Sequence, residues 1–308
     1  IHSHPANEPV MKGYMEEIGS PNLGMGGYYE FAGVIFYGDE EAKRAAAEVA
    51  YCEQLKSGCT TVCDLSAAYP GWLELAARSG LRIWIAPMFR NGKPVTRDGK
   101  SLVYEWDREA GAQAFKTALD HVDAAERHNS SLLSGMVMPA QCDTITEDML
   151  QDAVAAARDR DVPLQIHGAQ NWAEFYEMTR RNGITPVEFM AKMGLLHSQS
   201  IVGHAIFIDK HPRLQWWSEN DVSILASSGV TVAHCPTVYS RRTWILHHFG
   251  KYLKAGVKMG MGTDTYPHNM VEEIRWASIL CKVAAGDVYA ALEKGSLDAT
   301  EFTVPYDD

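Results

Sequence analysis

The sequence contains no CxxC pair, no disulfide-like cysteine spacing and no long apolar segment. Its six cysteines are scattered at positions 52, 59, 63, 142, 235 and 281. This scatter is typical of reduced thiols in a cytosolic protein, since disulfide frameworks belong to short secreted chains. No apolar run reaches the roughly 20 residues that a membrane helix needs, so we expect no membrane partner. The chain begins at Ile1 on a histidine pair without a Met, and we expect a trimmed N-terminus.

Positive charge is also scarce. The chain has 28 Lys and Arg against 39 Asp and Glu, a net charge of -11. An acidic chain repels a phosphate backbone, so we expect no nucleic-acid partner and instead a small-molecule substrate. With 308 residues and 46% hydrophobic composition, the chain can bury one large core.

What the sequence does have is a repeated strand-then-helix pattern. Seven short apolar, β-branched runs read as strands, at 59–65, 81–88, 132–138, 162–167, 200–204, 230–234 and 257–262. Residues 1–4 read as the frayed end of an eighth. Helical patterns lie between them, at 40–56, 107–128, 146–160, 220–228, 243–255 and 269–284.

Alternating β and α units predict an α/β fold with a parallel sheet, and eight units favour a closed (β/α)8 TIM barrel over 1–284. A doubly wound sheet is the alternative fold. It would need a glycine-rich phosphate loop after the first strand, and the segment from Gly24 to Tyr28 matches poorly. Residues 285–308 are turn-rich, and we interpret them as a tail or the remnant of a small β annex.

Histidines and one aspartate recur at the ends of these predicted strands. His2 and His4 are two apart, so both side chains point to one face of a strand. Four further strand ends carry one such residue each: His167, His204, His234 and Asp264. The carboxyl ends of barrel strands converge on the rim where active sites lie, so we expect these six side chains at one mouth.

Histidines with a carboxylate and no thiolate set are ligands for zinc, iron, cobalt or manganese. We expect zinc. A catalytic site keeps an open position for water, and a metal-bound water has a pKa near 7. The pattern therefore indicates metal-dependent hydrolysis.

Five motifs together resemble the amidohydrolase superfamily, in its branch of triazine hydrolases and guanine and cytosine deaminases. They are His2-x-His4, His167, Gly203-His204, His234-Cys-Pro236 and Gly262-Thr-Asp264. The resemblance implies one divalent metal held by His2, His4, His167 and Asp264. It implies that His204 contacts the attacking water or a developing oxyanion, and that Asp264 takes a proton.

The family also carries a small β-sandwich formed by the chain ends, and its members are commonly homo-oligomers, which we expect here by analogy. Binuclear members use a lysine at the end of the fourth strand. Here the run 132–138 leads into Pro139 and Ala140, so we expect one metal per chain.

One position departs from the deaminase pattern. Deaminases of this branch have Glu three residues after the third histidine, whereas this chain has Gln170, which cannot titrate. We therefore predict hydrolysis at an acyl carbon of an apolar amide, urea, carbamate or thiocarbamate. The alternative is a deaminase or dechlorinase of an N-heterocycle, and a third reading is a catalytically inactive metal-binding protein.

Several aromatic residues are candidates for the substrate pocket. Tyr28 and Tyr29 follow the loop of the first strand, and Trp172 lies just past His167. Loops after barrel strands reach the mouth, so we predict that these three contact the substrate. We expect His234 to shape the rim and to have a smaller effect on turnover than His204.

Overall fold

The computed structural model describes residues 2–6, 20–35, 39–214 and 216–293. Parallel strands line its centre in two sheets. The first holds β1 (Thr61–Asp64), β2 (Arg82–Ile85) and β6 (Leu133–Gly135). The second holds β8 (Leu164–Gly168), β9 (Ser200–His204), β10 (Thr231–His234) and β11 (Lys258–Met261).

The N-terminal segment closes these sheets into a barrel. Ser3 forms parallel bridges to both Asp64 and Asp264, so it joins β1 to the end of β11. The Leu65 N–H donates to Ser3 O at 2.9 Å, and the Asp264 N–H donates to His2 O at 2.9 Å. On the other side, a bridge from Val137 to Leu164 joins the end of β6 to β8. The predicted (β/α)8 barrel is confirmed, and the doubly wound alternative is wrong because bridges among the described residues join the two sheets on both sides.

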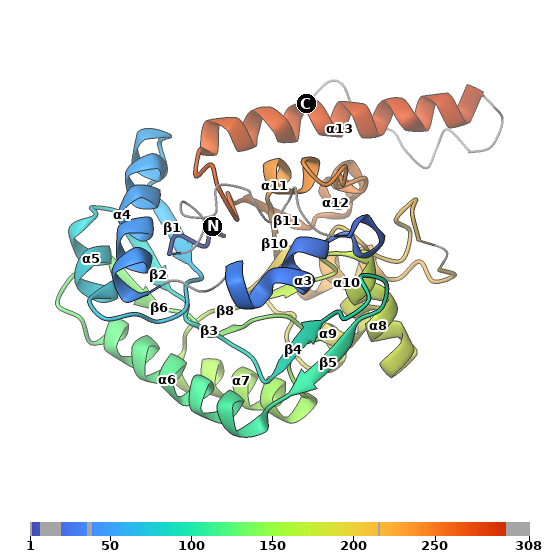
Figure 1. Ribbon diagram of the computed structural model, residues 1–308. Coiled ribbons are helices and arrows are strands. Elements are labelled where there is room, and N and C mark those ends of the chain that lie inside the picture. The colour runs from blue at the N-terminus through green and yellow to red at the C-terminus, as the bar shows by residue number, and fades with distance from the viewer. Residues whose placement is uncertain (1, 7–19, 36–38, 215, 294–308) are drawn as a thin grey trace.

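Helices surround the strands (Figure 1). They are α4 (Glu40–Lys56), α5 (Trp72–Arg78), α6 (Arg108–Glu126), α7 (Glu147–Arg160), α8 (Trp172–Asn182), α9 (Pro186–Lys192), α10 (Asp221–Ser228), α11 (Pro236–Ser240), α12 (Phe249–Ala255) and α13 (Met270–Glu293). Local sequence sets their starts. Asp39 accepts the Ala42 N–H at 2.7 Å before α4, and Thr185 with Glu188 forms a capping box on α9.

Further elements cover the mouth. They are η1 (Pro21–Leu23), α3 (Gly26–Ile35), the short strands β3 (Met88–Phe89) and β7 (Met138–Pro139), and an antiparallel hairpin of β4 (Gly92–Val95) and β5 (Val103–Trp106). In Figure 1, α3 lies across the middle of the barrel and the hairpin lies beside it.

Strand alternation decides what faces the barrel interior. On β8, Leu164 and Ile166 are fully buried in the main apolar cluster, together with Phe175 of α8 and Met190 of α9. Each such aliphatic side chain stabilises the fold by about 1.5–3 kcal/mol. Gln165 and His167 alternate with these two residues along β8, so their side chains point to the opposite face, toward the barrel interior.

Some expectations about the elements were wrong. The helix expected over 243–255 begins only at Phe249, and Thr243 at the start of the expected range has a positive φ of 61°, which is not helical. The last helix continues to Glu293, past the end expected at 284. The α3 helix and the β4–β5 hairpin were not anticipated.

The β annex expected from the chain ends is not seen among the described residues. Segment 2–4 joins the barrel through the bridges of Ser3 and 285–293 continue α13, whereas 294–308 of the expected tail lie outside the described part of the chain. The division between barrel and tail stays a prediction. Over the described residues, no helix combines the length and apolar character needed to cross a membrane.

Candidate metal centre and active-site cavity

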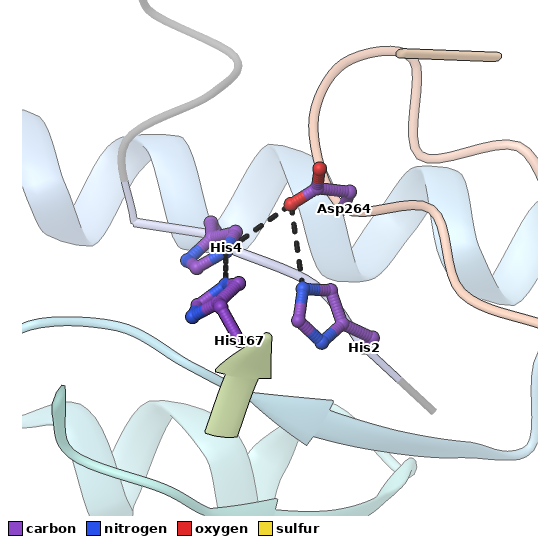
Figure 2. Close-up of side chains that lie close together, drawn as sticks. All are labelled: His2, His4, His167 and Asp264. Carbon is purple, nitrogen blue, oxygen red and sulfur yellow. Dashed lines mark hydrogen bonds and ion pairs between the residues drawn. The ribbon is translucent and has the colours of Figure 1, made fainter. Parts of the chain in front are cut away.

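Four side chains converge at the carboxyl ends of the strands (Figure 2). One donor atom from each of His2, His4, His167 and Asp264 lies within 4.8 Å of the others. His4 Nε2 lies 3.2 Å from His167 Nε2 and 3.2 Å from Asp264 Oδ1. His2 Nε2 lies 3.5 Å from the same Oδ1. The residues predicted as the ligand set therefore meet at one point.

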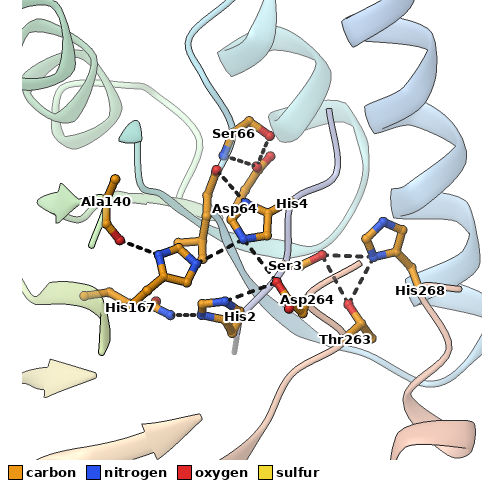
Figure 3. Close-up of polar contacts among 12 residues, drawn as sticks. His2, Ser3, His4, Asp64, Ser66, Ala140, His167, Thr263, Asp264 and His268 are labelled. Carbon is orange, nitrogen blue, oxygen red and sulfur yellow. Dashed lines mark hydrogen bonds and ion pairs between the residues drawn. The ribbon is translucent and has the colours of Figure 1, made fainter. Parts of the chain in front are cut away.

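The far side of each imidazole ring has a polar neighbour (Figure 3). His4 Nδ1 lies 3.1 Å from the Leu65 carbonyl oxygen, and His167 Nδ1 lies 2.5 Å from the Ala140 carbonyl oxygen. A carbonyl can only accept, so both rings carry their proton on Nδ1 and turn a lone pair on Nε2 toward the centre. This is the arrangement that metal-binding histidines adopt.

Burial controls the charges at this point. It lowers the pKa of His2 to about 4 and the pKa of His167 well below the ordinary value. Burial alone would raise the pKa of Asp264, but the close imidazoles of His2 and His4 hold that pKa well below its usual range. Near neutral pH, His2 and His167 are therefore neutral imidazoles and Asp264 is a carboxylate. These donors fit a divalent ion such as zinc, with His4, His167 and Asp264 also lining an open cavity.

Two glycines make room for His2. A Cβ at Gly203 would lie 2.7 Å from His2 Cε1, and a Cβ at Gly262 would lie 2.7 Å from His2 O. Both approaches are closer than real Cβ contacts allow. The glycines of the Gly203-His204 and Gly262-Thr-Asp264 motifs are thus required by the close packing of the first ligand.

His204 lies beside the donor set. Its side chain is fully buried, and neither ring nitrogen has a hydrogen-bond partner among the described residues. Its ring centre lies 4.8 Å from that of His2 and 4.7 Å from that of Tyr239. Burial also lowers its pKa well below the usual value.

His234 is also buried, with its ring centre 5.8 Å from that of Phe249. It belongs to neither group of potential metal ligands, and neither His204 nor His234 is among the described residues that line the cavity.

A cavity of about 310 Å³ opens from the donor set. Its apolar wall includes Met25, Met88, Phe89, Ala114 and Val238. Its polar side chains include Tyr28, Gln141, Gln170, Tyr239, Lys43, Arg90 and Arg242. Among the described lining residues, Asp264 is the only carboxylate.

The predicted substrate contacts are divided between cavity and core. Tyr28 lines the cavity, where its hydroxyl receives an N–H from Arg90 Nη1 at 2.6 Å. Tyr29 is buried with its hydroxyl 3.5 Å from Asn171 Oδ1, and Trp172 packs against Trp244 with ring centres 5.1 Å apart. Tyr29 and Trp172 are absent from the described lining, so they support its wall from behind.

Gln170 lines the cavity, and its position is fixed by a buried carboxyl. Glu174 Oε2 accepts the Gln170 N–H at 2.7 Å, and Oε1 accepts the Ala169 N–H at 2.7 Å. Burial and the nearby Asp143 raise the pKa of Glu174 to about 8. The sequence indicates this contact only weakly, because a glutamate such as Glu174 is also common in the first turn of an ordinary helix.

Comparison with known proteins agrees with this geometry. A family model described as the amidohydrolase family matches residues 16–303. A 5-methylthioadenosine/S-adenosylhomocysteine deaminase of Natronomonas pharaonis is 28% identical over 252 residues, 80% of this chain and 53% of the relative.

Two solved structures share the fold. Guanine deaminase of C. acetobutylicum, with guanine bound, has a TM-score of 0.72 at 16% identity, covering 96% of this chain and 67% of that one. Atrazine chlorohydrolase of Arthrobacter aurescens, complexed with zinc, has a TM-score of 0.63 at 18% identity, covering 87% and 59%.

The barrel fold and the family match together define the class of this protein. The chain belongs to the amidohydrolase family. It spans about half the length of the curated relatives that it matches.

Proposed function

We propose that this protein is a zinc-dependent hydrolase that displaces a substituent, in the first place an amino group, from a ring carbon of an N-heterocycle. One observation carries the proposal: the three imidazoles and the carboxylate of Asp264 converge beside a cavity of about 310 Å³, of which His4, His167 and Asp264 form one side. Similar proteins named as deaminases support the choice of heterocycle over acyl substrate. The heterocycle therefore replaces the acyl substrate as the first candidate, whereas Gln170 alone had favoured the acyl substrate.

In this proposal His2, His4, His167 and Asp264 hold one divalent metal per chain. A metal bound there supplies a Lewis acid that lowers the pKa of water toward about 7. Zinc is favoured because the imidazole and carboxylate donors suit it and because similar structures contain it.

The chain's own residues then handle protons and orientation. Asp264 is kept ionised, so its carboxylate can accept a proton from the attacking water. His204, with two unpartnered nitrogens, can donate a hydrogen bond to charge that develops on the substrate. Gln170 can orient a ring nitrogen or a carbonyl through its amide.

Three cations suggest what else the substrate carries. Lys43, Arg90 and Arg242 line the cavity. The Arg90 guanidinium donates to the Tyr28 hydroxyl, and none of the ion pairs among the described residues involves it. Its remaining N–H donors suit a carboxylate or phosphate. We therefore expect a heterocycle with an anionic or oxygen-rich substituent.

Gln170 favours a second candidate. Ring deamination needs a proton on the ring nitrogen and another on the departing ammonia, and Gln170 cannot supply either. Hydrolysis of amides, ureas, carbamates or thiocarbamates asks less of the leaving group. This observation keeps acyl hydrolysis as the alternative.

The two candidates differ in the product they release. Purified protein is stripped with a chelator, reloaded with zinc and assayed with aminated heterocycles and with anilides, ureas and carbamates. The heterocycle set includes 5'-methylthioadenosine, S-adenosylhomocysteine, guanine and an aminotriazine. We expect zinc-dependent ammonia release from at least one of these and one zinc per chain by elemental analysis. Turnover of the acyl set alone would favour the second candidate, and a metal-binding protein that turns over neither set would contradict both.

A further inference from the structure

Gln165 lies against the one histidine of the donor set that has no backbone carbonyl behind it. His4 and His167 direct Nδ1 at the carbonyl oxygens of Leu65 and Ala140. His2 Nδ1 instead lies 2.5 Å from the side-chain amide of Gln165. Gln165 is fully buried and is two residues before His167 on β8, so it shares the interior face of that strand.

The orientation of this amide decides which nitrogen of His2 carries the proton. With Nε2 of Gln165 turned to the ring, Nδ1 accepts, the imidazole proton lies on Nε2, and Oε1 of Gln165 is buried without a partner. In that form His2 Nε2 can only donate toward Asp264 Oδ1, 3.5 Å away. With the amide rotated by 180°, Oε1 accepts the Nδ1 proton and Nε2 has a lone pair for a metal.

We infer that Gln165 is a positioning residue for the metal. Its Oε1 accepts the Nδ1 proton of His2 and so fixes the tautomer of His2 whose Nε2 can bind the metal. The inference rests on the metal site of the proposed function. It gives all three histidines the same design, in which an oxygen acceptor behind the ring directs Nε2 inward. The backbone of Gly203 packs against the same ring, since a Cβ there would lie 2.7 Å from His2 Cε1 and 3.1 Å from Nδ1.

The amide differs from a backbone carbonyl in that it can rotate. Its two ends can match either tautomer of His2, with Nε2 turned to the ring before metal binds and Oε1 turned to it afterwards. A carboxylate at this position can only accept, and therefore favours the metal-binding tautomer alone. A Leu at this position offers nothing to the Nδ1 proton, which is then buried without a partner.

The test is zinc affinity, measured by competition with a chromophoric chelator on wild-type protein, Gln165→Leu and Gln165→Glu. We expect Gln165→Leu to weaken zinc binding by about 10- to 100-fold, the usual cost of removing such a partner. We expect Gln165→Glu to bind zinc at least as tightly as wild type. Thermal unfolding of the metal-free proteins checks that both variants fold.

Gln54→Leu is a matched control. Gln54 is another buried glutamine beside the same segment, and its side-chain amide donates to Ser3 Oγ at 2.8 Å rather than to an imidazole. Its loss should leave zinc affinity within a few-fold of wild type.

The outcomes separate two failures. If wild-type protein does not bind zinc, the proposed function fails. If wild type binds zinc and Gln165→Leu binds it equally well, or if Gln165→Glu is as weak as Gln165→Leu, only the role of Gln165 is overturned.

Discussion

Replacing His204 by Asn tests whether this residue acts on the substrate or on the metal. His204 has a φ of 83°, a left-handed conformation that Asn adopts more readily than most residues. The change therefore keeps the backbone while removing the imidazole from beside His2 and Tyr239. The variant should fold, and its metal ligands should be unaltered.

The size of the effect follows from the contacts. Neither nitrogen of His204 bonds to another described residue, so few stabilising interactions are lost. The amide of Asn again places two polar atoms at this buried position, so the main loss is the packing of the larger ring, and we expect the free energy of unfolding to change by less than about 2 kcal/mol. Loss of a preorganised hydrogen-bond donor to developing charge costs about 2.7–4 kcal/mol in the transition state, a fall in kcat of about 10²–10³.

The measurements are kcat on the best substrate of the panel, zinc per chain and thermal unfolding. We expect a large fall in kcat, one zinc per chain and little change in stability. Loss of zinc together with activity would show that His204 is a metal ligand. This alternative has a structural basis, because donor atoms of His204, His2 and Cys235 lie within 4.8 Å of one another. Unchanged kcat would refute the catalytic role.

Three other changes test separate parts of the site. Arg90→Met should raise KM at least tenfold for substrates with a carboxylate or phosphate and leave neutral analogues unchanged; an equal rise for both would contradict an anion contact. Gln170→Glu should increase ammonia release from aminoheterocycles, because it adds a titratable group, and no gain in that assay would argue against deamination. Glu273 is buried with Oε1 unpartnered, and burial raises its pKa to about 8. Between its unfolded pKa of about 4.3 and that value the folded state binds more protons, so stability falls as pH rises through this window. Glu273→Gln should therefore match wild type in thermal unfolding at pH 5 and be more stable by about 1–3 kcal/mol at pH 8.5; equal stability at both pH values would show that the buried carboxyl has no such cost.

The strand ends of the barrel could be predicted because two regular patterns coincide there. Parallel strands give short β-branched runs, and their carboxyl ends meet at one rim. His167, His204 and Asp264 each follow such a run, so their common location needed no tertiary model. The geometry around His2 was accessible only in part. The interior position of Gln165 follows from its spacing to His167, but its contact with His2 joins residues 163 apart in sequence.

The cavity wall could not be predicted from local pattern. The pair Gly26 and Gly27 indicates a turn, yet α3 forms there and places Tyr28 over the mouth. Its first turn is stabilised by packing of Tyr29 into the core and by the Arg90 contact of Tyr28, which are both tertiary. In the same way, no sequence periodicity distinguishes a loop arginine that lines the cavity, such as Arg90, from an arginine that is exposed to solvent.

Backbone strain and function coincide at the ends of β8, β9 and β11. Ala169, His204 and Asp264 have φ values of 51°, 83° and 55°, conformations that cost of order 1–3 kcal/mol each. Asp264 is held in this conformation from both sides, because its N–H donates to His2 O and its carbonyl accepts the His4 N–H, each at 2.9 Å. The short segment from His2 to His4 therefore does two things at once. It supplies two imidazoles, and its backbone bonds keep the carboxylate of Asp264 turned toward them. Ligands from opposite ends of the sequence are therefore held together as one unit.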